Sequence, residues 1–291
     1  MSGCRSIVIA PYGNAATTLS DSWLKYRDQK EFDVCLLFYH QEVLEPKKYE
    51  MVDYFFHLKG FKYRMIHEVL TNLHPEWMDK YDYFFFIDDD VQIDTLQINR
   101  MFSLARAHDI WICQPSLSKD SFCSWPILKT NDRCFCRYMG QIEVMAPLFS
   151  NYALKICMEA GTFITNNSSW GIDCAWTHLL GYSRNKLVVF DIVTMKHIHP
   201  VGKGELYKKI GDPYKDWQEV VKKYGTKRIN YQEYGRLLKV NAHTAPIQFT
   251  RYKMVEQFNR LKQAYNDYDL PSRIRSQLHK AKSLFKKPPA L

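Results

Sequence analysis

Three adjacent aspartates follow an apolar run in the stretch YDYFFFIDDDVQID, residues 81–94, and they constrain this chain more than any other feature. The carboxylates belong to Asp88, Asp89 and Asp90. Adjacent carboxylates repel one another, and burying even one is costly unless a cation or hydrogen bonds offset the charge. Because this triplet directly follows an apolar strand, the segment predicts a binding site for a positively charged group.

Apolar strands alternate with helical patterns through the first two thirds of the chain. Strands are predicted in SIVIAPYG, FDVCLLFYH, YDYFFFI and DIWICQPS, and helices in DSWLKYRDQK, KGFKYRMIHEVLTNL and DTLQINRMFSLARAH. This alternation predicts an α/β fold, a mostly parallel central sheet with helices on both faces. Ligands of such sheets bind beyond the carboxyl ends of the strands, which is where the aspartate triplet lies.

The later segments predict the domain organisation. Residues 116–138 have the pattern of an irregular polar loop, QIEVMAPLFS is strand-like up to a turn at Pro147, and KLVVFDIVTMKHIHP predicts two short strands. NYALKICMEAG and SSWGIDCAWTHLLGY are helical. Helical patterns rich in Lys and Tyr dominate beyond residue 204. We therefore predict a catalytic α/β domain over 1–204 and a helical C-terminal appendage over 205–291.

The net charge of +9 is concentrated at the C-terminus, because residues 271–291 contain six Lys or Arg and no acidic residue. Apolar residues recur there at helical spacing, at Ile274, Leu278, Ala281 and Phe285. This pattern predicts a basic amphipathic helix suited to an anionic membrane surface. The alternatives are a helix packed on the body with a solvated basic face and, less favoured, a nucleic-acid contact.

Composition favours a folded protein in a reducing compartment. A hydrophobic fraction of 46% supplies a sizeable core. The chain has eight cysteines, several in apolar runs, and we expect buried free thiols. Cys123, Cys134 and Cys136 lack the usual two-residue gap of a zinc corner. No secretory signal and no apolar run of about 18 residues is present, so we expect a cytoplasmic protein, with attachment to the inner face of a membrane as an option.

The aspartate triplet supplies the chemistry of a cation site. Asp-x-Asp oxygens at a strand end suit Mg²⁺ or Mn²⁺, which commonly bridge one or two carboxylates and substrate phosphates. The bound cation then stabilises charge on a departing diphosphate. The alternative is a solvated turn whose aspartates cap the next helix.

Two further motifs contain side chains suited to such a site. In SSWGIDCAW, a tight turn leads into a helix with Asp173 in its first turn, where an acid can serve as a general base or simply interact with the helix dipole. In MKHIHP, His197 and His199 follow an apolar strand, and alternation predicts that both imidazoles share one face. Either histidine is a candidate metal ligand, and a structural role is the alternative.

The order Asp-x-Asp, Trp-Gly-x-Asp and strand-end His resembles metal-dependent glycosyltransferases of the A-type fold. The segments FYH (38–40), LHPEWMDKYDYFFFIDDD, ICQPSL, IEVMAPLFS and WGIDCAW are similar to the family named domain of unknown function 707. This resemblance covers about residues 5–205. The chain departs from the plant members at Ile87-Asp88-Asp89-Asp90, where they have Trp-Asp-Glu-Asp, and at Ser169, where they have Gly.

The resemblance implies a transfer of sugar from a nucleotide-sugar donor to a hydroxyl of a glycan or lipid-linked acceptor, with Mn²⁺ or Mg²⁺. A well-placed base predicts inversion, and a retaining mechanism, which needs no such base, is the alternative. The resemblance also implies that Asp90 binds the cation directly, that His197 completes the metal shell, and that Asp88 contacts the ribose or helps to hold the cation. The remaining implied donor-site residues are Asp89, Tyr12 and Lys62, with Lys62 at the diphosphate. On the acceptor side it implies Asp173 as the base, with Glu143 and Trp170 as acceptor contacts.

A second class of enzyme also uses an apolar strand that ends in Asp-x-Asp, namely the haloacid-dehalogenase-like, Mg²⁺-dependent phosphatases. The chain contains a literal Gly-Asp-x-x-x-Asp, residues 211–216, which that class uses for Mg²⁺. The preceding ELYKKI is polar and helical rather than a strand, which argues against this alternative. A basic protein that binds membrane or nucleic acid without catalysis is the third hypothesis.

Overall fold

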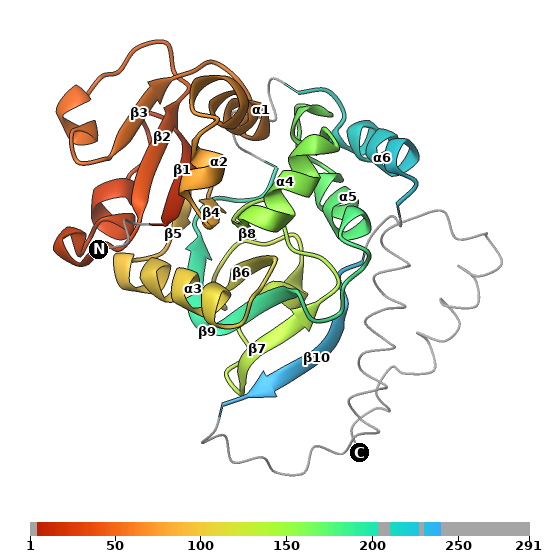
Figure 1. The fold of residues 1–291 in the computed structure, drawn as a ribbon. Coiled ribbons are helices and arrows are strands. Elements are labelled where there is room, and N and C mark those ends of the chain that lie inside the picture. The colour runs from red at the N-terminus through yellow and green to blue at the C-terminus, as the bar shows by residue number, and fades with distance from the viewer. Residues whose placement is uncertain (1–4, 203–209, 227–229, 240–291) are drawn as a thin grey trace, which may run out of the picture. The chain divides into compact units, whose positions relative to one another are not determined.

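The computed structural model describes residues 5–202, 210–226 and 230–239, all within one structural unit that ends at Val240 (Figure 1). The basic tail over 271–291 lies outside the described residues, so its amphipathic helix stays a prediction. Within the described part of the chain, no helix combines the length and the apolar character needed to cross a bilayer.

A central sheet organises the described chain, with the strand order β10-β7-β9-β6-β8-β4-β1-β2-β3, and the short β5 pairs with β9. The α/β class is confirmed, and the sheet is mixed. The pairs β1–β2, β1–β4, β2–β3 and β6–β9 are parallel, whereas β8 is antiparallel to β4 and β6, and β7 to β9 and β10. Sequence patterns indicate strands but not their direction, so the antiparallel members were not predicted. The strands are β1 Ser6–Tyr12, β2 Asp33–Phe38, β3 Tyr54–His57, β4 Tyr83–Phe86, β5 Val91–Gln92, β6 Ile112–Leu117, β7 Cys134–Met139, β8 Leu148–Ser150, β9 Leu187–His197 and β10 Glu233–Leu238.

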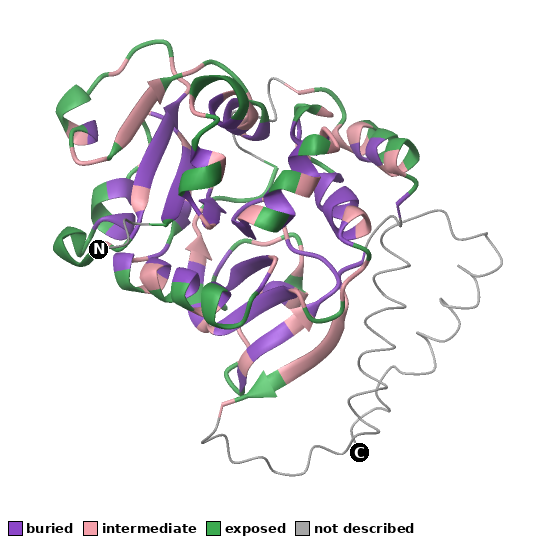
Figure 2. Ribbon diagram, viewed as in Figure 1, coloured by how far each residue is buried: buried purple, intermediate pink, exposed green. Residues whose placement is uncertain are grey.

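The centre of the sheet is the core of the molecule. Every residue of β4 and of β6 is buried. Continuously buried strands of this kind occur where both faces of a sheet are covered. Figure 2 shows burial concentrated in the central strands, while helices such as α3 and α6 expose residues on their outer surfaces. The apolar run before the aspartate triplet is therefore a core strand.

Helices connect the strands and pack on the sheet. The segment α3 begins after Asp94, whose side chain accepts a hydrogen bond from the Gln97 amide, and α4 begins after Ser150, which caps the Ala153 amide. α1 packs near β1, α3 on β6 and β9, and α4 on β8. The helices are α1 Lys62–Glu68, α2 Trp77–Lys80, α3 Thr95–Ala107, α4 Asn151–Glu159, α5 Ile172–Leu179 and α6 Pro213–Tyr224.

Several elements differ from the sequence prediction. The strand expected in QIEVMAPLFS before the turn at Pro147 does not form, and β8 begins after that proline, at Leu148. The helix expected over 21–30 forms only a π-helical turn, Leu19–Trp23, and a 3₁₀ turn, Arg27–Gln29. The strand β3 was missed, β7 lies inside the predicted 116–138 loop, and the two strands expected near 187–197 form the single strand β9. The register of β9 slips between Phe190 and Thr194, which explains why its pattern predicted two strands.

The chain beyond residue 204 contributes to the same unit. The helix α6 packs against α5, and β10 pairs with β7 at the edge of the sheet. The predicted boundary at 204 therefore precedes a strand of the central sheet. Most residues of β10 are half-buried and its sequence is EYGRLL, so it lacks the apolar run that marks the inner strands.

The Gly-Asp-x-x-x-Asp motif lies at the start of α6. The Asp212 carboxylate caps this helix by accepting from the Tyr214 amide, and Asp216 accepts from the Ser168 amide at 3.4 Å. Both aspartates thus lie at the start of α6 and accept hydrogen bonds from backbone amides. Neither lies at the carboxyl end of a strand.

The cysteines within the described residues are free thiols, and all except Cys123 are buried. Burial raises the pKa of the Cys35, Cys113 and Cys157 thiols well above the ordinary value of a cysteine. These thiols are packing groups of the core.

Candidate active site

The aspartate triplet lies in a turn between β4 and β5, at the carboxyl end of β4. The two residues of β5 pair antiparallel with the end of β9, so that Val91 lies opposite His197. This pairing brings Asp90 to a histidine more than 100 positions away in the sequence. The structure therefore joins two of the three predicted metal-ligand residues through backbone pairing.

The Asp90–His197 contact has the geometry of a ligand pair. Nε2 of His197 lies 3.1 Å from Oδ2 of Asp90, and Nδ1 lies 3.1 Å from the Phe122 carbonyl oxygen. Both partners accept hydrogen bonds, so Nδ1 donates to the carbonyl and Nε2 donates to the carboxylate in this structure. A cation bound by Asp90 would take the place of the Nε2 hydrogen, while the bond from Nδ1 keeps the ring oriented. Burial lowers the pKa of His197, but the hydrogen bond and charge of Asp90 outweigh it and raise the pKa overall.

His199 is a weaker partner of the same carboxylate. Its Nδ1 lies 3.6 Å from Oδ2 of Asp90, and its side chain is 66% exposed, against 12% for His197. Strand β9 ends at His197, so His199 lies beyond the strand. The strand alternation that predicted a shared face for the two imidazoles therefore does not apply to His199.

The ammonium of Lys62 forms an ion pair with Asp88, the first aspartate of the triplet, and is not free in this structure. Its Nζ lies 2.7 Å from Oδ1 of Asp88 and donates to the carbonyls of Val144 at 2.9 Å and Met145 at 2.7 Å. An ammonium has three N–H donors, and these three acceptors match them. Burial lowers the pKa of Lys62, and Asp88 opposes that shift. The contact of Lys62 with a diphosphate stays a prediction, and in this structure its three donors are used within the protein.

Asp89 ties the triplet to the loop that follows β1. Its Oδ2 accepts from the Gly13 amide at 3.1 Å and from the Tyr39 hydroxyl at 2.9 Å. Burial, with Asp90 second, raises the pKa of Asp89 to about 7. A Cβ added to Gly13 would lie 2.5 Å from the Tyr39 hydroxyl oxygen, so only glycine allows this approach. Gly13 and Tyr39 were not predicted as site residues, although Tyr39 lies in the FYH segment.

Tyr12 lies beneath the site rather than in it. The side chain is 0% exposed, and its hydroxyl accepts from the Leu19 amide at 3.0 Å. Burial raises the pKa of Tyr12 to about 12. A fully buried ring with a satisfied hydroxyl supports the loop after β1 and has no surface for a donor, which corrects its predicted role.

Asp173 occupies the first turn of α5 and is nearly buried. Its Oδ1 accepts from the Cys174 amide at 3.0 Å, and its Oδ2 accepts from the Tyr231 hydroxyl at 2.9 Å. Burial raises the pKa of Asp173, while these hydrogen bonds and one to Gln141 oppose the shift. Tyr231 in turn stacks on Trp125, with ring centroids 4.5 Å apart. Tyr231 and Trp125 are site residues that the sequence reasoning missed.

The Trp-Gly turn before α5 has a steric reason. Gly171 has φ of 84°, and a Cβ there would lie 2.5 Å from Cδ1 of Trp217. Ser169 also adopts a left-handed conformation, with φ of 65°, which favours the glycine of the plant members at this position. Trp170 between them is 39% exposed. The turn thus leaves an aromatic side chain at the surface, three positions before Asp173.

Glu143 lies among the other ionisable groups of the site. Burial, followed by the charge of Asp173, raises the pKa of Glu143 to about 7. The charges of His197, Asp88 and Lys62 also act on this pKa. The Asp88 amide donates to the Met145 carbonyl at 3.1 Å, which places the aspartate triplet beside the segment that carries Glu143. Its Oε2 is buried and has no hydrogen-bond partner within the described protein.

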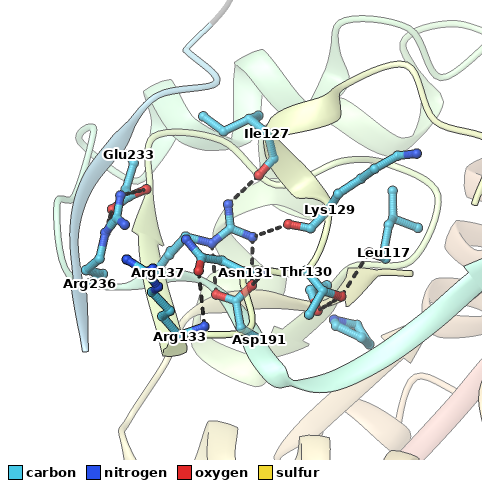
Figure 3. A network of polar contacts seen from close by, with 12 residues as sticks. Leu117, Ile127, Lys129, Thr130, Asn131, Arg133, Arg137, Asp191, Glu233 and Arg236 are labelled. Atoms are coloured by element: carbon cyan, nitrogen blue, oxygen red, sulfur yellow. Dashed lines mark hydrogen bonds and ion pairs between the residues drawn. The ribbon is translucent and has the colours of Figure 1, made fainter. Parts of the chain in front are cut away.

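A buried ion pair anchors the loop over 118–131 that borders the site (Figure 3). Nε and Nη2 of Arg137 donate to Asp191 at 2.8 and 2.9 Å, and Nη2 also donates to the Lys129 carbonyl at 2.9 Å. The same loop carries Phe122, whose carbonyl holds His197, and Trp125. A shallow pocket lined by this network, from Pro126 to Arg133, lies on the loop and does not include the aspartate triplet.

The donor set suits an open cation site. Within the described residues, no group of three or more His, Cys, Asp or Glu side chains is arranged as a complete metal cage. Asp90 and His197 offer one oxygen and one nitrogen ligand, and Mg²⁺ or Mn²⁺ sites often complete their shell with substrate phosphates and water. The residues present therefore fit a cation that arrives with a phosphorylated ligand.

Comparisons with solved structures give the fold. A crystal structure of GalNAc-T7 with UDP, GalNAc and Mn²⁺ matches with a TM-score of 0.53 and 9% identity, over 75% of this chain and 48% of that chain. A crystal structure of S. aureus TarS 1-349 in complex with UDP-GlcNAc matches with a TM-score of 0.48 and 11% identity, over 76% of this chain and 65% of that one. This chain thus spans less than two thirds of either structure. The predicted glycosyltransferase A-type fold is confirmed.

Among curated proteins, none matches this sequence. A family model described as "Protein of unknown function (DUF707)" matches residues 4–239, which include every described strand and helix. The resemblance noted in the sequence is therefore confirmed, and this chain belongs to the DUF707 family.

Proposed function

We propose that this protein is a metal-dependent glycosyltransferase, which moves a sugar from a nucleotide-sugar donor to a hydroxyl of a glycan or lipid-linked acceptor. The single observation that carries the proposal is the contact of Asp90 with Nε2 of His197 beyond the carboxyl end of β4. In open α/β sheets, ligands bind at this edge. The fold likeness to a structure that contains UDP, GalNAc and Mn²⁺ supports the same chemistry.

Asp90 and His197 would hold Mn²⁺ or Mg²⁺ together with the donor diphosphate. The cation supplies positive charge to the departing nucleoside diphosphate. Asp88 is proposed to contact the ribose or the cation, with Lys62 balancing part of its charge. Asp89 positions the triplet through its hydrogen bonds to Gly13 and Tyr39.

The acceptor side lies toward α5. The exposed Trp170 and the carboxylates of Asp173 and Glu143 are the proposed acceptor contacts. One of these carboxylates takes the proton of the attacking hydroxyl, and the family resemblance assigns that role to Asp173. A base on the acceptor side implies direct attack on the anomeric carbon and inversion of its configuration.

A thermal-shift panel tests the proposal. The full chain is heated with nucleotide sugars in the presence of Mn²⁺ and, separately, with EDTA. We expect one donor to raise Tm only with Mn²⁺, because binding to the native state alone stabilises it. Asp90→Asn should abolish this shift and lower turnover by about 100-fold or more.

His199→Ala is the matched control, because His199 is exposed and lies farther from Asp90. It should keep most of the donor-dependent shift, whereas His197→Ala should lose it. If neither Asp90→Asn nor His197→Ala changes the shift of a donor that binds, the cation site has been misplaced. If no nucleotide sugar binds or reacts, the proposed function is wrong.

A further inference from the structure

Glu143 has a rigid backbone and an unpaired side-chain oxygen. Its amide donates to Oε1 of the fully buried Gln114 at 2.9 Å. The next carbonyl along the chain, that of Val144, accepts from Lys62 at 2.9 Å and from the Tyr63 hydroxyl at 2.7 Å. The segment is thus held by β6 on one side and by α1 on the other, which is the support that an active-site group requires.

The buried Oε2 of Glu143 lacks any hydrogen-bond partner within the described protein. A buried polar atom without a partner destabilises the folded state, and few native proteins keep one without a reason. Asp173 is different, because both of its oxygens already accept hydrogen bonds, from Cys174 and from Tyr231. Of the two carboxyl groups, Glu143 therefore has the one with an unsatisfied oxygen.

We propose that Glu143 is the group that takes the proton from the acceptor hydroxyl, and that Asp173 is a positioning residue beside it. This inference rests on the proposed function and reassigns one role within it. The acceptor O–H bond breaks, its proton moves to the carboxylate of Glu143, and the oxygen forms the bond to the anomeric carbon. The bond from that carbon to the diphosphate oxygen breaks, and its electron pair leaves with the nucleoside diphosphate.

The electrostatic surroundings of Glu143 suit this role. Burial is the main cause that raises the pKa of Glu143 to about 7, and the charge of Asp173 is the second. A base whose pKa lies near the working pH transfers protons efficiently. Two neighbouring carboxyl groups with different environments divide the roles of proton carrier and charged partner. The titratable groups whose charges act on Glu143, or on which its charge acts, are Asp173, Asp88, His197, Lys62, Tyr63, Tyr231 and Cys123.

Glu143→Gln and Asp173→Asn separate the two roles in the full chain. The rate of nucleoside diphosphate release from a nucleotide-sugar panel with Mn²⁺ is measured from about pH 5 to about pH 9, the range around the pKa of Glu143. Glu143→Gln should lower kcat by about 100- to 10,000-fold. It should also remove the acid limb of the pH profile, which is the fall in rate as pH drops below the pKa of Glu143. Glu143→Asp should keep that acid limb at a reduced rate, because a titrating carboxyl remains.

Asp173→Asn should keep the acid limb but move it to lower pH, because the Asp173 charge raises the pKa of Glu143. A merely structural role for Asp173 would not move the limb. The proposal is overturned if Glu143→Gln keeps the acid limb and more than about a tenth of kcat, a loss far below that expected of a general base. It is equally overturned if the limb disappears in Asp173→Asn.

A second measurement needs no substrate. The pKa of Glu143 is raised on folding, so its carboxyl weakens the folded state as pH rises from the unfolded pKa toward about 7. Glu143→Gln should therefore have a higher Tm than the wild type, by a margin that widens across this window. A constant margin would show that Oε2 is not the buried, unpaired oxygen on which the proposal depends. If this margin widens but the wild type turns over no donor, the proposed function fails and the base role fails with it.

Discussion

Lys62 shows how one side chain organises the site through contacts within the protein. Its ammonium joins Asp88 to two carbonyls of the segment that carries Glu143. The proposed donor side and the proposed acceptor side of the site therefore both contact the Lys62 ammonium. Burial raises the pKa of Asp88 and Lys62 opposes that shift, so removal of the ammonium would favour a protonated Asp88.

Lys62→Met should lower the free energy of unfolding by about 2–3 kcal/mol, because it leaves the buried Asp88 carboxylate without its ion-pair partner and removes one of the donors of the Val144 and Met145 carbonyls. Lys59→Met is the matched control, since Lys59 is exposed near the start of the same helix and should change stability by less than about 0.5 kcal/mol. Urea denaturation of both variants checks this prediction. Equal stabilities for the two variants would contradict the stabilising role of these contacts.

At the scale of an element, α5 depends on the turn that precedes it. Two left-handed positions on either side of Trp170, Ser169 and Gly171, direct the chain so that Trp170 is exposed while Asp173 turns inward. Gly171 also lies against Trp217 of α6, so the turn depends on a helix beyond the predicted domain boundary. The motif Trp-Gly-x-Asp is thus a packing requirement as well as a chemical one.

Gly171→Ala should cost about 2–4 kcal/mol, because it adds left-handed strain and a Cβ 2.5 Å from Trp217. Gly181→Ala isolates the strain, since φ there is 68° and nothing lies within 4 Å of the added Cβ. Its cost should be about 1–2 kcal/mol. Thermal unfolding of both variants measures the difference, and a Gly171→Ala variant no less stable than Gly181→Ala would rule out the close contact as the reason.

At the scale of the whole molecule, the mixed sheet places the site where β4 and β9 end beside each other through β5. The buried pair of Arg137 and Asp191 anchors the loop that borders this edge. The basic tail over 271–291 lies outside the described residues, and its role stays a prediction from the sequence.

Deletion of residues 271–291 should abolish flotation of the protein with vesicles that contain phosphatidylglycerol, because a basic amphipathic helix binds anionic lipid through both charge and apolar burial. Replacement of Ile274, Leu278 and Phe285 by Ser keeps all the charge and should weaken flotation as well. Neutral vesicles provide the control. Equal flotation of the deleted and full chains would exclude membrane attachment through this tail.

The sequence by itself determined the α/β class, the core strand before the triplet and the helix that starts near Asp173. These features follow from hydrophobic periodicity and from capping residues, which act over a few neighbouring positions. It also indicated Asp90, His197 and Glu143 as site residues, through resemblance to a family.

Only the tertiary structure decided which of these groups meet and what each still has to bind. The contact of Asp90 with His197 depends on the pairing of β5 with β9. The segment 233–238 belongs to the central sheet because it pairs with β7 at the edge of that sheet. The donors of Lys62 are used, whereas the Oε2 of Glu143 is unpaired, and neither fact is visible in a residue type. Local patterns determine which face of an element is buried, but the partners of a side chain come from segments that are distant in the sequence.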